Sequence, residues 1–103
     1  MTLAELSPPR IEPKIYKYSF GSLCRGIHVA EINGPALMNI LDIQEQGNDL
    51  VLWAEVDTAQ MGARQAVKIF AAYTGDPPPG HAWTYFKTIQ SWEYLVYHIY
   101  IHK

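Results

Sequence analysis

The stretch that decides the fold is Trp83–His102, which reads WTYFKTIQSWEYLVYHIYIH. It is rich in aromatic and β-branched residues, which favour strands. Because side chains alternate between the two faces of a strand, its second half divides into two largely apolar sets. These sets are Tyr94, Val96, His98 and Tyr100 on one face, and Leu95, Tyr97, Ile99 and Ile101 on the other.

Both faces of this strand therefore need to be covered. A small sheet covers only one face with its own chain, so the second face needs another layer, a partner subunit or a ligand. Large exposed apolar patches usually mark interfaces, so the two-sided strand predicts a homo-oligomer.

Length and composition limit the class of protein. A chain of 103 residues with 49% hydrophobic and 17% charged residues is one folded domain and excludes a disordered chain. The formal net charge of −2 argues against binding to duplex nucleic acid, whose affinity comes from many phosphate contacts. No run approaches the roughly 20 apolar residues of a membrane span, so no membrane partner is expected.

Compartment follows from cysteine usage and from the start of the chain. Cys24 is the only cysteine, so no internal disulfide can form and nothing indicates an oxidising compartment. Residues 1–13 lack the basic and continuous apolar regions of a signal peptide. We therefore expect a cytoplasmic protein.

Alternating segments upstream complete an all-β pattern. The clearest unit is 37–57, where two strands flank the hairpin loop Gln46–Asp49. In its second arm Leu50, Leu52, Ala54 and Val56 form one apolar face, and Trp53, in mid-strand, is expected to be largely buried. The other predicted strands are 14–20, 27–32, 67–73, 83–90 and 94–102, whereas 58–66 fits either a loop or one helical turn.

The predicted fold is all-β, a compact antiparallel sandwich or barrel-like sheet of about seven strands. Three prolines make residues 1–13 a poor helix interior, so we assign them to an N-terminal proline-rich arm. Residues 14–103 form a single β domain. Its last hairpin is expected to turn at Ser91, Trp92 and Glu93.

The strongest loop signal is Thr74–His81, which reads TGDPPPGH. Successive prolines favour polyproline II geometry, so this loop is stiff. A stiff loop loses little entropy when a partner binds, and Asp76, His81 and Trp83 offer an acceptor, a switchable donor and a stacking face. We expect the segment from Thr74 to Trp83 to form one wall of the functional site.

Aromatic side chains near basic ones are typical equipment for holding a planar base and its phosphates. Aromatic residues also pack the core of many β proteins, and that role is the alternative for each of them here. The candidate ligand-binding residues are Tyr73, Thr74, Gly75, Asp76, His81, Trp83 and Tyr85, with Arg64, Lys68 and Lys87 as candidate phosphate contacts.

Other reactive side chains form no recognisable constellation. His98 and His102 have the spacing of a helical metal pair, but in a strand they lie about 13 Å apart. Cys24 and His28 resemble a thiol and a base, yet no acidic residue nearby in sequence would orient them. No glycine-rich phosphate loop occurs, because prolines remove the donors near Gly75. We predict no catalytic residue, metal or cofactor.

Several separated segments share an order and spacing with a known family. They are KIYKY (14–18), LDIQ (41–44), LWAEVD (52–57), the Thr74-Gly75 loop with its prolines, and LVYH (95–98). Together they resemble a small uncharacterised family, a domain of unknown function common in bacteriophage and prophage genomes. The resemblance covers residues 14 to 100 and implies a phage-type accessory protein in a bacterial cytoplasm, with no assigned active site.

Two binding functions follow from these features, and an enzyme with a site assembled from distant residues is the third alternative. The first is a non-enzymatic protein that sequesters a small nucleotide-derived ligand, such as a host immune signal. The second is a protein-interaction module that inhibits a host or phage protein through an edge strand or an aromatic patch. An aromatic pocket with an Arg near residues 74–83 would favour the first, and a flat exposed apolar patch would favour the second.

Overall fold

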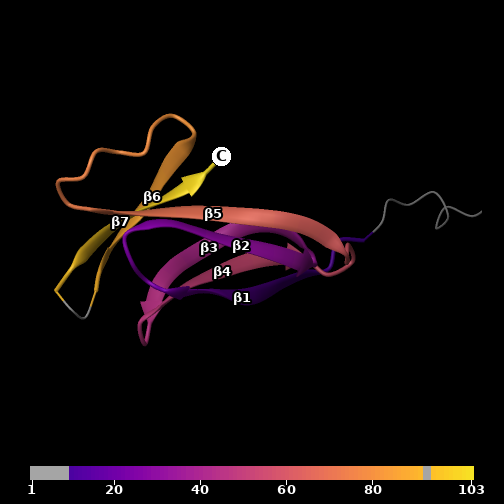
Figure 1. Cartoon of the computed structure of the whole chain (residues 1–103). Coiled ribbons are helices and arrows are strands. Elements are labelled where there is room, and N and C mark those ends of the chain that lie inside the picture. The colour runs from indigo at the N-terminus through magenta and orange to yellow at the C-terminus, as the bar shows by residue number, and fades with distance from the viewer. Residues whose placement is uncertain (1–9, 92–93) are drawn as a thin grey trace, which may run out of the picture.

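The computed structural model describes residues 10–91 and 94–103, and it confirms the all-β prediction (Figure 1). Seven strands in two antiparallel sheets make up the regular structure of these residues. They are β1 (Pro13–Ser22), β2 (Gly26–Gly34), β3 (Ala36–Gln46), β4 (Asp49–Asp57), β5 (Ala63–Tyr73), β6 (Trp83–Gln90) and β7 (Val96–His102).

One sheet has three strands in the order β1-β4-β3, and the other has four in the order β2-β5-β7-β6. β1 lies near β2, and β3 lies near β6, so the sheets meet along both edges. No ladder joins the two sheets in the described residues, which makes the fold a sandwich rather than a barrel. In Figure 1 the β6–β7 hairpin lies at one end of the long strand β5 and crosses it at a steep angle.

The core lies between the sheets and follows the alternation of the sequence. On β4, Leu50, Leu52, Ala54 and Val56 are fully buried, as their spacing predicts. Opposite them, the core residues of the four-stranded sheet include Val67, Ile69 and Ala71 on β5 and Tyr97 and Ile99 on β7. Burial of each large aliphatic side chain contributes roughly 1.5–3 kcal/mol.

Trp53 is partly buried, and it is not one of the core residues. It alternates with the core residues Leu52 and Ala54, so it lies on the outer face of the three-stranded sheet. Its cross-strand neighbours are Lys17 and Asp42, and the Lys17 ammonium lies 5.9 Å from the centre of its ring. Mid-strand position therefore placed Trp53 in the sheet but not in the core.

Residues 58–66 contain no helical turn. The chain turns over 58–62, where Gly62 has a φ of 82°, and β5 begins at Ala63. Its first residues pair with β2 in an unbroken register from Gly34–Ala63 to Gly26–Ala71. This pairing extends the strand into residues whose own propensities permit a helix.

The N-terminal arm lies mainly outside the described residues, and the division into arm and domain stays a prediction. Its last part is held by β4: the Glu12 N–H donates to Asp57 Oδ1 at 3.0 Å, and the Glu12 carbonyl accepts from Thr58 N at 2.9 Å. β1 then begins at Pro13. The predicted turn residues Trp92 and Glu93 also lie outside the described residues. The parts of the chain described here contain no helix long and apolar enough to cross a membrane.

Candidate functional site

The outer face of the four-stranded sheet carries a continuous row of apolar side chains. β5 pairs with β2 along its length but with β7 only from Ile69 onward, so all four strands lie abreast around Phe70. Phe70 alternates with the core residues Ile69 and Ala71, which directs its side chain outward. The direct cross-strand neighbours in this row, which we call the aromatic row, are Ile27, Phe70, Tyr100 and Tyr85.

Ring contacts fix the geometry of the aromatic row. The Tyr85 and Tyr100 rings meet edge to face with centroids 5.7 Å apart. Trp83 extends the row, because its ring contacts Phe70 at 5.7 Å and His102 at 4.9 Å, also edge to face. Each such aromatic pair contributes about 0.5–1.5 kcal/mol beyond its buried area. The rings therefore hold one another in place while Tyr85 remains 53% exposed.

A chain of hydrogen bonds borders the aromatic row. His98 lies on the outer face of β7, and its Nε2 is 2.8 Å from Thr74 Oγ1 while its Nδ1 is 3.0 Å from Thr88 Oγ1. The Thr88 hydroxyl is in turn 2.7 Å from the Tyr85 hydroxyl. Both ring nitrogens of His98 thus have hydroxyl partners, and hydroxyls can donate or accept. These hydrogen bonds link Thr74 of the proline-rich loop to Tyr85 of the aromatic row, and they fix the orientation of the Tyr85 hydroxyl.

The start of the proline-rich loop is held by contacts of Asp76 with residues outside the loop. Asp76 Oδ2 accepts the Tyr73 N–H at 2.9 Å and lies 3.4 Å from Arg25 Nε, and the Arg25 guanidinium is 5.4 Å from the centre of the Tyr73 ring. An open depression of about 280 Å³ lies between the loop and β7. Its lining comprises Ala72, Tyr73, Thr74, Gly75, Asp76, Pro78, His98 and Tyr100.

The fold separates the three predicted phosphate contacts. Lys68 lies on the outer face two residues from Phe70, beside the aromatic row. Arg64 is near the other end of β5, roughly 20 Å from Phe70 at about 3.3 Å per residue, and lines a hollow with Glu31 and Asn33. Lys87 shares the inward-facing side of β6 with Ile89. Only Lys68 joins the aromatic row.

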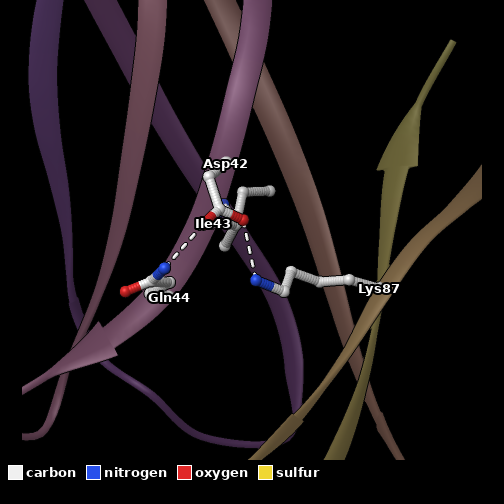
Figure 2. Close-up of polar contacts among 4 residues, drawn as sticks. All are labelled: Asp42, Ile43, Gln44 and Lys87. Atoms are coloured by element: carbon white, nitrogen blue, oxygen red, sulfur yellow. Dashed lines mark hydrogen bonds and ion pairs between the residues drawn. The ribbon is translucent and has the colours of Figure 1, made fainter.

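Lys87 instead connects the two sheets, as Figure 2 shows. Its Nζ donates to Asp42 Oδ1 on β3 at 2.7 Å. Asp42 also accepts from the Ile43 N–H at 2.8 Å and from Gln44 Nε2 at 2.6 Å. Partial burial would raise the pKa of Asp42, but these hydrogen bonds and the charge of Lys87 outweigh it and hold that pKa below its ordinary value.

The remaining loop residues have different surroundings. His81 is exposed in the turn that leads to Trp83, and the end of the loop is held by the Lys103 N–H, which donates to the Ala82 carbonyl at 2.8 Å. Tyr73 faces the sandwich interior, with its ring 5.3 Å from that of Tyr97. The structure thus brings Thr74, Trp83 and Tyr85 to the outer face and leaves Tyr73 at the end of the core.

Cys24 and His28 do meet in space, with 4.0 Å between Sγ and Nε2. The same nitrogen lies 2.7 Å from the Cys24 carbonyl oxygen, which can only accept. His28 Nε2 therefore carries the proton and donates, so it cannot take a proton from the thiol. Within the described residues no group of three or more His, Cys, Asp or Glu side chains is placed to hold a metal ion.

Sequence reasoning placed His98 and Tyr100 on a second apolar face of their strand but not among the candidate binding residues. It missed Ile27 and Phe70 as their neighbours, and Arg25 beside the loop. A signal for the first group was present, since the apolar character of both faces of β7 implied a second surface. The strand order that sets Ile27 and Phe70 beside Tyr100 could not be deduced from alternation within single strands.

The family model for a domain of unknown function, DUF7352, matches residues 12–103. The chain belongs to this family. The match confirms the resemblance to a family of unknown function and includes every strand of both sheets. Comparison with curated proteins gives no significant match, and comparison with solved structures gives none either.

Proposed function

We propose that this member of the DUF7352 family is a non-enzymatic protein-interaction module that binds a host or phage protein with the outer face of its four-stranded sheet. The observation that carries the proposal is the aromatic row, which crosses all four strands and has no layer over it in the described chain. Polar residues are the usual occupants of the solvent-facing side of an antiparallel sheet. A row of rings there supplies the aromatic anchors that dominate protein interfaces.

The composition of the surface defines the partner it fits. Ile27 is 60% exposed and Val29 is 54% exposed, so the apolar area continues onto β2. Lys68 is the cross-strand neighbour of Val29 and provides a positive charge at its margin. The complementary partner is a protein with an exposed apolar patch and an acidic side chain at its rim.

The test is capture from phage-infected bacterial lysate, followed by titration of the identified and purified partner. Tyr85→Glu introduces a charge at the β6 end of the row, against the Tyr100 ring, and should weaken binding by at least about tenfold. Ile15→Glu, at a 67% exposed residue on the other sheet, is the matched control and should bind like the wild type. Equal affinities for the wild type and a folded Tyr85→Glu variant would refute this function.

The second candidate is capture of a small nucleotide-derived ligand at the proline-rich loop. It is favoured by the depression beside Thr74, Asp76 and Tyr100, which combines hydroxyl, carboxylate and aromatic groups. Its volume of about 280 Å³ lies below the 300–1,000 Å³ common for ligand sites, and no Arg or Lys lines it. These properties place the flat aromatic row ahead of it.

Native mass spectrometry of protein purified from infected cells separates the two candidates, because a retained small molecule adds a defined mass. His81→Ala combined with Trp83→Ala should abolish ligand binding if the loop is a wall of that site. An unchanged affinity in the folded double variant would place the ligand elsewhere.

Both candidates share the origin and compartment that the family resemblance implies. We propose a phage or prophage accessory protein acting in the bacterial cytoplasm, where sequestration or inhibition of a host factor would counter defence. Expression only after phage infection or prophage induction, followed by fractionation with cytoplasmic markers, would support this assignment.

A further inference from the structure

The four edge strands of the sandwich differ in how well they are protected against pairing with another strand. An exposed edge presents unpaired N–H and C=O groups, and proteins block it with bulges, Pro, Lys or inward-pointing charges. β3 has two register shifts, between Leu37 and Asn39 and between Ile40 and Asp42. β6 has one shift before Lys87, whose charge points inward.

β1 is protected in a similar way. It begins with Pro13 and Lys14, carries Lys17 in its middle, and loses its regular register between Ser19 and Ser22. Three of the four edges are therefore irregular or charged.

β2 is the exception. Its register with β5 is unbroken over the full length from Gly26 to Gly34, and its sequence GIHVAEING contains no Pro, Lys or Arg. It ends the four-stranded sheet, and within the described residues no backbone hydrogen bond reaches it from a strand other than β5. A regular edge with exposed Ile27 and Val29 beside it is a template for strand addition.

We propose that β2 pairs antiparallel with β2 of a second copy of this chain, which joins the two four-stranded sheets into one continuous sheet. A second copy is the occupant that the edge fits best, because the same open edge is used twice and the assembly closes at two subunits. The formal charge of −2 per chain keeps repulsion between copies small. This inference is independent of the proposed function, since the aromatic rows of both copies stay exposed on one side.

The register of this pairing follows from the sequence of β2. With Ala30 on the two-fold axis all nine residues of the strand are paired. Val29 then lies opposite Glu31 of the partner subunit, and Ile27 lies opposite Asn33 of the partner subunit. A two-fold axis at Glu31 would instead place two carboxylates directly opposite each other, which is destabilising.

Analytical ultracentrifugation of the purified full chain tests the pairing. Wild type should show a reversible monomer–dimer equilibrium at micromolar concentration. Val29→Glu adds two like-charge pairs per dimer and should raise the dissociation constant by about tenfold or more. Ile15→Glu adds the same charge to β1 and should leave the constant unchanged. Adding Glu31→Lys to Val29→Glu creates opposite-charge pairs in the proposed register and should restore the dimer.

Three results would overturn the proposal. The first is a wild-type chain that remains monomeric throughout the micromolar range. The second is a folded Val29→Glu variant, verified by circular dichroism, that dimerises like the wild type. The third is a dimer that Tyr85→Glu disrupts and Val29→Glu does not, which would place the contact on the outer face instead of the edge.

Discussion

The contact between Asp42 and Lys87 should stabilise the sandwich by a measurable amount, because it ties the edge of one sheet to the edge of the other (Figure 2). Two unit charges 4 Å apart attract by about 4 kcal/mol at an effective dielectric constant of 20. The two side chains are 35% and 30% exposed, so solvent screening and side-chain ordering reduce the net contribution. We expect about 1 kcal/mol at neutral pH.

A double-mutant cycle measures the contribution of the Asp42–Lys87 ion pair to the free energy of unfolding. Asp42→Asn and Lys87→Met, alone and together, are compared with the wild type by urea denaturation, and the coupling energy should be about 1 kcal/mol. Lys87→Met retains an unbranched apolar stem, which limits the loss of packing. For a chain of this size a loss of 1 kcal/mol lowers the Tm by roughly 4–8 °C.

The pH dependence provides an independent check on the same pair. The pKa of Asp42 is lowered in the folded state, so the unfolded chain binds a proton first as the solution is acidified. The contribution is complete above the unfolded pKa of about 3.9 and is lost as pH falls through the folded pKa. The stability difference between wild type and Asp42→Asn should therefore shrink in acid. A coupling energy near zero, or a difference that grows in acid, would refute the reasoning.

Three further substitutions test other contacts. Leu52→Ala, in the core, should cost about 2–5 kcal/mol, whereas Trp53→Ala on the outer face should cost less by urea denaturation; the reverse order would contradict the assignment of faces. Asp57→Ala should cost about 1–3 kcal/mol, because the buried carboxylate accepts three hydrogen bonds, and a near-wild-type transition would contradict its role. Burial and the nearby Tyr16 raise the pKa of Tyr18, so stability should fall as pH rises above about 10, and Tyr18→Phe should remove part of this loss; identical alkaline unfolding curves would refute it.

Much of the architecture follows directly from local patterns. The alternation of Leu50, Leu52, Ala54 and Val56 identified both a strand and its buried face, because a strand repeats every two residues and one face must leave water. The turn chemistry of Gln46–Asp49 located the hairpin between β3 and β4. These inferences hold because they depend on residues close together in the sequence.

The same logic identified a second apolar face on β7 but not what lies on it. Alternation separated His98 and Tyr100 from the core residues Tyr97 and Ile99, as the structure confirms. Which strands flank β7, and which of their residues are level with Tyr100, depends on strand order and register. Those are set by packing between segments distant in the chain, which no local pattern encodes.

The sequence by itself therefore determined the all-β class, the buried face of β4 and the approximate positions of the strands, except that β5 begins at Ala63 and β7 only at Val96. Only the tertiary structure decided that Lys87 at the edge of one sheet bonds to Asp42 at the edge of the other, that Trp53 lies outside the core and that Phe70 sits between Ile27 and Tyr100. It also showed that β2 is the regular, open edge. The physical reason is that local propensity acts within a few residues, whereas faces, edges and cross-strand neighbours arise only when distant strands pair and pack.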